Sequence, residues 1–278
     1  MATPTITHVI FDMDGLLLDT EGFYTLVQEK ILEPYGKKFD WELKAQMMGR
    51  KAIESARIFV EASGLTGVLS PEEFLDERER MLQELFPSCT LLPGTVLCSR
   101  NYEVVSGAGK GFCALQIRSR TLGEPSSCKG DTDVCCDGVI PFSLSFYGTY
   151  YFLFIFYLFC LFSSHQRHFS LKTQNHGKLF SLMHHVVKGD DPEVKQGKPS
   201  PDVFLAALRR FEGNVDASNC LVFEDAPTGV AAAKNAGMSV VMVPDERLDL
   251  SYRKQADQVI SSLLEFQPEY WGLPPFED

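Results

Sequence analysis

The chain has 278 residues, of which 45% are hydrophobic and 23% are charged. These proportions exclude collagen-like, coiled-coil and wholly disordered proteins. The 37 acidic and 26 basic residues give a net charge of -11, which opposes binding to nucleic acid phosphates, so we expect no nucleic-acid partner.

The first third of the chain predicts one buried strand followed by helices. Residues 6–11 are a β-branched and aromatic run that ends at Asp12, which is typical of a strand that feeds a loop. From residue 21 to about residue 86, apolar residues recur at helical spacing. We therefore expect several helices here, separated at Gly36, Gly49, Gly64 and Pro71. The N-terminus lacks the basic and apolar stretches of a secretory signal, and we expect a cytoplasmic location.

Residues 95–162 differ in composition from the rest of the chain. They hold six of the eight cysteines and equal numbers of acidic and basic residues, so the net negative charge lies outside them. Their first half has neither helical nor strand periodicity and is very long for a loop. We interpret them as an anomalous insertion or replacement, and we hypothesise that it arose from translated non-coding sequence or alternative splicing.

Periodic structure returns after this segment. In chain order the pattern predicts a helix over 166–183, a strand at 184–187, a helix over 201–211, a strand at 220–225, a helix over 228–236 and a strand at 239–244. Strands that alternate with helices predict an α/β fold with a doubly wound, Rossmann-like parallel sheet. We assign residues 1–17 and 93–278 to this core domain and residues 18–92 to an inserted α-helical cap domain.

Five charged residues lie where a doubly wound sheet binds its ligands. Asp12 and Asp14 follow the first strand, Glu224 and Asp225 end a later strand, and Lys198 precedes a helix. Ligands bind at the carboxyl ends of parallel strands, so we expect these residues to meet there. Four carboxylates around one ammonium would repel each other without a hard cation. Mg²⁺ held by carboxylates and a substrate phosphate fits this site, and the lysine would face the phosphoryl oxygens.

Each signal taken alone has a simpler interpretation. An Asp-x-Asp-Gly sequence after a strand is often a turn, and a lone lysine is usually solvated. A Glu-Asp pair before a helix is a common N-terminal cap. The presence of all three, in this order along the chain, favours the functional interpretation.

Three segments carry a family resemblance: FDMDGLLLDTE (11–21), GKPSPDVF (197–204) and VFEDAPTGV (222–230). They resemble the haloacid dehalogenase-like phosphohydrolases, and the resemblance extends over residues 6–94 and 163–278. It implies a Mg²⁺-dependent phosphatase that hydrolyses a small phosphomonoester through an aspartyl-phosphate intermediate. The cap and tail segments imply a nucleoside-type 5′-monophosphate, pseudouridine 5′-phosphate, as the substrate.

The resemblance also assigns roles to the matching residues. Asp12 is expected to be the nucleophile, and Asp14 the acid/base that protonates the leaving oxygen and later activates water. Lys198 is expected to pair with Asp12 and the phosphate. The expected Mg²⁺ ligands are Asp12, the backbone carbonyl of Asp14 and Asp225, with Glu224 as a second or indirect ligand.

The family places a Thr or Ser hydroxyl at the end of the strand that follows the cap, where it binds the phosphoryl group. Counting back without gaps, this position falls on Phe162, and Ser163 is its neighbour. One interpretation is that residues 155–162 form the strand and Ser163 supplies the hydroxyl. The alternative is a poorly soluble and at best weakly active chain. In the cap, Gly49 and Arg50 are expected to face the substrate.

An uncharged run over residues 138–164 is long enough for a membrane span. A single crossing would, however, place Asp12 on one side of the bilayer and Lys198 with Asp225 on the other. We therefore expect no membrane partner, a small phosphorylated metabolite as ligand, and a monomer. Two alternatives stay open: a sugar-phosphate phosphomutase of the same family, and a non-catalytic, misfolded or membrane-associated splice product.

Overall fold

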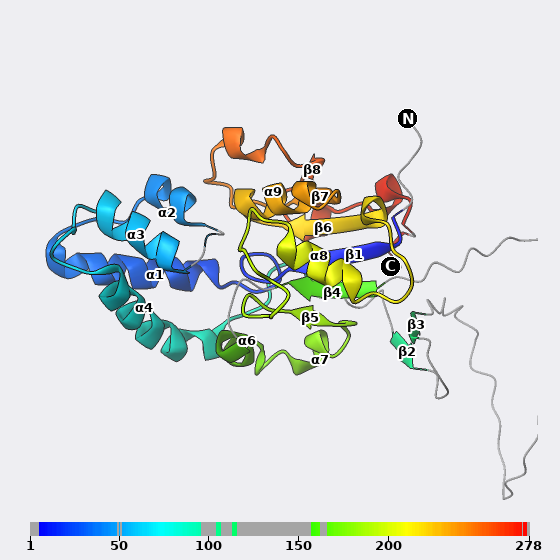
Figure 1. The fold of residues 1–278 in the computed structure, drawn as a ribbon, viewed down its shortest axis with the longest axis horizontal. Coiled ribbons are helices and arrows are strands. Elements are labelled where there is room, and N and C mark those ends of the chain that lie inside the picture. The colour runs from blue at the N-terminus through cyan, green and yellow to red at the C-terminus, as the bar shows by residue number, and fades with distance from the viewer. Residues whose placement is uncertain are drawn as a thin grey trace, which may run out of the picture.

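The computed structural model describes residues 6–48, 50, 52–95, 104–106, 113–115, 157–161, 166–273 and 275–276. Within these residues, a sheet of six parallel strands has the order β5-β4-β1-β6-β7-β8. Helices α1 to α4 lie together beyond the ends of the strands, on one side of the sheet (Figure 1). The α/β class and the parallel, doubly wound sheet are thus confirmed.

The strands are short and mostly buried. Their bounds are β1 (His8–Asp12), β2 (Val104–Ser106), β3 (Cys113–Leu115), β4 (Tyr157–Leu161), β5 (Val186–Val187), β6 (Cys220–Glu224), β7 (Ser239–Met242) and β8 (Gln258–Val259). The strands β2 and β3 form a separate antiparallel pair away from the main sheet (Figure 1). The edge strand β8 was not predicted, and neither were β2 and β3 in the stretch without periodicity, because two or three residues are too few to show any.

The helices follow the predicted order. Their bounds are α1 (Glu21–Leu32), α2 (Trp41–Met47), α3 (Ala52–Ala62), α4 (Pro71–Leu85), α6 (Gln166–Thr173), α7 (Gly177–Phe180), α8 (Asp202–Arg209) and α9 (Pro227–Asn235). Single 3-10 turns cover Glu33–Tyr35, Phe86–Ser88, Ala217–Asn219, Leu250–Arg253, Leu263–Glu265 and Pro268–Trp271.

Several predicted elements are shorter in the structure than expected, among them α8 and β7, which each end two residues early. The single helix expected over residues 166–183 is two helices, α6 and α7, because the chain turns where the amide of His176 donates to the carbonyl of Thr173. The strand expected at 184–187 starts only at Val186. His184 and His185 instead pack their rings against Phe211 beside the sheet.

Residues 157–161 form the strand β4 between β1 and β5. The register pairs His8 with Tyr157 and Asp12 with Leu161. The end of the segment of anomalous composition therefore supplies an internal strand of the sheet, as one of the two interpretations expected. The remainder of the uncharged run, with Ser163, lies outside the described residues. Among the helices that the structure describes, none combines the length and apolar character needed to cross a bilayer.

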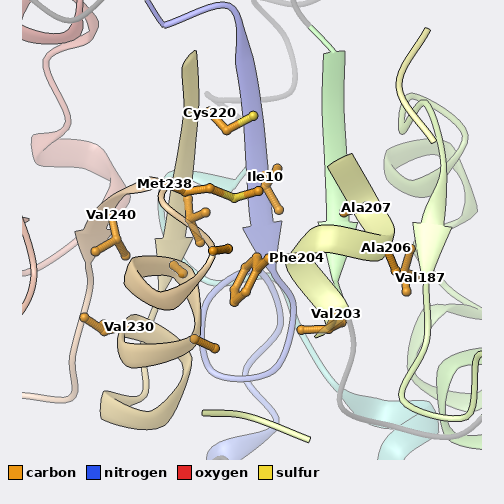
Figure 2. Close-up of a cluster of buried hydrophobic side chains, with 14 of the residues drawn as sticks. Ile10, Val187, Val203, Phe204, Ala206, Ala207, Cys220, Val230, Met238 and Val240 are labelled. Carbon is orange, nitrogen blue, oxygen red and sulfur yellow. The ribbon is translucent and has the colours of Figure 1, made fainter. Parts of the chain in front are cut away.

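Two apolar layers cover the two faces of the sheet, as the alternation of side chains along strands requires. Ile10, Val222 and Val240 face helices α8 and α9 and pack around the fully buried Phe204. Figure 2 shows this layer between the strands and the two helices. The neighbouring strand residues Phe11 and Phe223 face the other way, where their rings stack 4.7 Å apart.

Helices α1 to α4 have an apolar core of their own. Phe59 of α3 stacks on Phe74 of α4 with ring centroids 4.0 Å apart, and both side chains are fully buried. Helix α4 begins with a capping box, in which the hydroxyl of Ser70 accepts from the amide of Glu73 and the Glu73 carboxylate accepts from the amide of Ser70. The predicted cap helices therefore exist; the domain boundaries at 17/18 and 92/93 stay a prediction.

Two histidines beside the sheet predict that the protein loses stability in acid. Burial, with His184 nearby, lowers the pKa of His8 to about 4, and burial with His184 and Arg210 nearby lowers that of His185 to about 4. The unfolded chain binds protons below about pH 6.5, whereas the folded state resists protonation until about pH 4. We therefore expect the free energy of unfolding to fall as the pH drops through this window.

Urea denaturation between pH 4 and 8 measures this effect, with His8→Leu as the comparison. The variant lacks one buried neutral histidine, so its stability should fall less steeply below pH 6.5. Above pH 7 the two curves should run parallel. If the stability of both proteins falls equally steeply below pH 6.5, His8 does not contribute to the loss of stability in acid.

Candidate active site

The predicted carboxylates meet at the carboxyl ends of β1 and β6. These strands are parallel neighbours, and the register pairs Phe11 with Phe223. Asp12 and Glu224 are the next residues on the two strands, so they lie side by side where the strands end. Asp225 follows directly, before α9 begins at Pro227.

Lys198 lies between two of these carboxylates. Its Nζ donates to Asp12 Oδ1 at 2.6 Å and also to Glu224 Oε1. All three side chains are no more than 6% exposed. Burial lowers the pKa of Lys198, but the two carboxylates outweigh burial and raise the pKa above its ordinary value. The lysine therefore stays charged and neutralises part of the buried negative charge.

Three carboxylates form a site that can hold a metal ion. Oxygen atoms of Asp12, Glu224 and Asp225 lie within 4.8 Å of one another. Burial raises the pKa of Asp12 to about 7 against the attraction of Lys198. Burial and the neighbouring Glu224 and Glu21 raise the pKa of Asp225 well above its usual value. A divalent cation fits these residues, because it prefers oxygen ligands and would offset negative charge that one lysine leaves uncompensated.

Two glycines allow the carboxylates to approach the backbone. Gly15 has a φ of +75°, and a Cβ there would lie 2.3 Å from Asp225 Oδ2. A Cβ at Gly229 in α9 would lie 2.0 Å from the Glu224 carboxyl group. Each glycine therefore leaves room for a carboxylate of the site, so the motifs need glycine as well as acidic residues.

Asp14 lies beside the other carboxylates but has different partners. Its Oδ1 accepts from the hydroxyl of Thr20 at 2.7 Å and from Lys172 Nζ at 2.7 Å. Lys172 belongs to α6 and was not among the residues predicted from the sequence. The available signal was its position three residues after Phe169, which places a lysine on the buried face of the helix.

The cap touches the core close to this site. The hydroxyl of Thr228, in the first turn of α9, donates to the carbonyl of Met48 at 3.2 Å. Arg50 is 38% exposed, and its guanidinium pairs with Glu54 and donates to the carbonyl of Gln46. In this structure Arg50 thus contacts residues of its own cap segment, Gln46 before it and Glu54 after it.

A second cap contact holds helix α2 against the core. The ring of Trp41 lies 4.5 Å from the guanidinium of Arg247, whose loop follows β7, and 4.7 Å from Lys44 Nζ. Lys44 is buried and pairs with Glu21 at 3.1 Å. Trp41 of the cap thus packs against a cation of the core, and the charge of Lys44 is compensated by Glu21.

The structure brings together Asp12, Lys198, Glu224 and Asp225 as predicted, with Asp14 beside them. Two other predicted site residues, Gly49 and Ser163, lie outside the described residues. The hydroxyl expected to bind the phosphoryl group therefore stays a prediction.

Comparison with known proteins adds independent evidence. The sequence pattern of the haloacid dehalogenase-like hydrolases matches residues 157–237. A (DL)-glycerol-3-phosphatase 2 from Arabidopsis thaliana is 56% identical over 99% of this chain and 94% of its own length. A probable pseudouridine-5′-phosphatase from Drosophila melanogaster is 39% identical over 98% of this chain and 96% of its own.

The fold also matches solved structures. A β-phosphoglucomutase from Clostridium difficile superimposes with a TM-score of 0.61 over 95% of each chain, at 20% identity. At this identity the likeness concerns the fold alone.

Proposed function

Because this chain belongs to the haloacid dehalogenase-like hydrolases and is a phosphatase of small phosphate esters, we propose that it is Mg²⁺-dependent and prefers glycerol 3-phosphate. The observation that carries the phosphoryl-transfer and Mg²⁺ part of the proposal is the buried Lys198 between Asp12 and Glu224, next to Asp225, where strands β1 and β6 end. Several charged groups buried together at the ends of strands are typical of a functional site, and here they are placed to bind a phosphoryl group.

In the first step, an Asp12 carboxylate oxygen attacks phosphorus, and the bond from phosphorus to the ester oxygen breaks. Asp14 gives the departing oxygen a proton, so the alcohol leaves neutral. Lys198 lies 2.6 Å from Asp12, so its ammonium can stabilise negative charge on the phosphoryl oxygens during the transfer.

In the second step, Asp14 takes a proton from water, whose oxygen attacks the phosphorus of the aspartyl-phosphate. The bond between phosphorus and Asp12 breaks, which frees phosphate and restores the carboxylate. Mg²⁺ held by Asp12, Glu224 and Asp225, with the backbone carbonyl of Asp14, would supply positive charge opposite the phosphoryl oxygens. We further propose that the hydroxyl of Ser163 donates a hydrogen bond to the phosphoryl group.

The substrate follows from the relatives rather than from the site. The 56% identical relative is named for glycerol 3-phosphate, and the 39% identical relative is named for pseudouridine 5′-phosphate. We therefore place glycerol 3-phosphate first and pseudouridine 5′-phosphate second. A cytoplasmic monomer remains our prediction for location and oligomeric state.

Phosphate release from the purified protein tests the proposal. The assay compares glycerol 3-phosphate, pseudouridine 5′-phosphate and glucose 1-phosphate, each with Mg²⁺ and with EDTA. We expect release that EDTA abolishes and that is fastest with glycerol 3-phosphate. Conversion of glucose 1-phosphate to an isomer without phosphate release would support the phosphomutase alternative. Release that is insensitive to EDTA would contradict the metal assignment.

Arg50 tests the role of the cap. We expect Arg50→Ala to raise KM for glycerol 3-phosphate about tenfold, equivalent to about 1.4 kcal/mol, because the cap segment would lose a cation for the substrate. Stability should change little, because the ion pair of Arg50 with Glu54 is exposed. Arg57→Ala removes an exposed arginine from helix α3, which begins two residues after Arg50, and is the matched control. Equal losses of kcat on every ester would assign Arg50 to chemistry or folding instead.

A further inference from the structure

Lys172 is a buried cation that the proposed mechanism does not use. Its side chain is fully buried, and its Nζ lies 2.7 and 2.9 Å from the two oxygens of Asp14. Burying an ammonium ion is costly unless a partner of opposite charge compensates it. The contact with both carboxylate oxygens is therefore the interaction that makes this burial tolerable.

The surroundings of Lys172 limit its movement. Tyr24 of α1 accepts a hydrogen bond from the ammonium at 3.1 Å, and the ring of Phe86 lies 4.4 Å from it. The thiol of Cys89 donates to the backbone carbonyl of Lys172 at 3.0 Å. Aromatic faces attract cations, so the ammonium is held on several sides at once.

The same contacts restrict Asp14. This residue lies in the loop after β1, where its side chain would otherwise sample several rotamers. The ammonium of Lys172 contacts both oxygens, and the hydroxyl of Thr20 donates to Oδ1. The Asp14 carboxylate is thus held between Lys172 of helix α6 and Thr20, which directly precedes helix α1.

We propose that Lys172 is a positioning residue that holds the Asp14 carboxylate where it accepts the proton of the attacking water in the second step. The inference rests on the proposed function, because it assumes that Asp14 is the acid/base. Asp12 and Asp14 then each pair with a different lysine: Lys198 contacts Asp12, and Lys172 contacts Asp14. With a leaving group that needs no proton, breakdown of the aspartyl-phosphate should depend on Lys172 more than its formation does.

The test separates the two steps with p-nitrophenyl phosphate. Nitrophenolate leaves without a proton, so formation of the aspartyl-phosphate needs no help from Asp14, whereas its hydrolysis does. We expect Lys172→Met to keep a fast first turnover but to lower the steady-state rate about 100-fold, the scale of general base catalysis. Stopped-flow measurement should then show a burst of about one nitrophenolate per active site.

Lys178→Met is the matched control, because Lys178 is an exposed lysine on the neighbouring helix α7. It should change neither phase. Asp14→Asn should reproduce the burst, and the double variant Asp14→Asn with Lys172→Met should be no slower than Asp14→Asn alone, since the two residues act as a unit. If Lys172→Met does not fold, Lys172→Gln takes its place, because it keeps a hydrogen-bonding group without the charge.

Two failures can be told apart. If Asp12→Asn keeps its turnover, the proposed function is wrong. If Asp12→Asn is inactive while a folded Lys172 variant loses both phases equally, or loses neither, only the positioning role is wrong. Losses that add in the double variant would likewise overturn it.

Discussion

Asp12→Asn should lower phosphate release by a factor on the order of 10⁴ or more, because an amide is a far poorer nucleophile than a carboxylate. The fold should persist. The amide has the same shape, and burial, which raises the pKa of Asp12, disfavours a negative charge at this position, while Lys198 keeps Glu224 as a partner. The expected variant is therefore a folded protein without turnover.

Steady-state phosphate release and thermal unfolding, measured on the same preparation, check this prediction. Asp19→Asn is the matched control, since Asp19 is an exposed aspartate in the same loop region. It should keep nearly full activity. Activity of Asp12→Asn within tenfold of the parent would refute the assignment of Asp12 as the nucleophile.

Lys198→Met should reduce both activity and stability. Removing the ammonium leaves Asp12 and Glu224 buried without their cation, and breaking a buried ion pair costs about 3–5 kcal/mol. Turnover should fall on the order of 10²- to 10³-fold, the range seen when one donor to a transition-state charge is removed. Lys198 would then count as part of the phosphoryl-binding machinery.

Urea denaturation with and without Mg²⁺ measures the effect on stability, and steady-state phosphate release measures the effect on turnover. Added Mg²⁺ should restore part of the lost stability of Lys198→Met, because a divalent cation can replace the missing charge among the carboxylates. Lys234→Met is the matched control. Its ion pair with Asp257 is exposed, so the loss should stay below about 1 kcal/mol. A Lys198→Met protein as stable as the control would contradict the buried pairing.

The anomalous composition of residues 95–162 had two predicted outcomes, and the structure bears on one of them. Residues 157–161 occupy the strand position between β1 and β5, as the first interpretation required. Low solubility and weak activity of the whole chain stay a prediction. Comparing its yield and turnover with a variant that carries a regular helix and a strand ending in Thr in place of 95–162 measures that outcome.

Local patterns in the sequence determined the order of elements and much of the candidate site. The apolar run ending at Asp12 and the run ending at Glu224 predicted two buried strands, because strand character depends on neighbouring residues. Parallel strands align their carboxyl ends, so the meeting of Asp12, Glu224 and Asp225 followed from the fold class. Lys198 could be added because its segment occurs in order with the two acidic motifs, and that combination is specific.

Only the tertiary structure decided that Lys172 is the partner of Asp14. Lys172 is distant in sequence from Asp14, and in the sequence it is a lysine on a short helix with little amphipathic character. Its role depends on the packing of α6 against Tyr24 and Phe86, which no local pattern records. Ion pairs between distant segments arise from the three-dimensional path of the chain, and burial then makes them strong by excluding water.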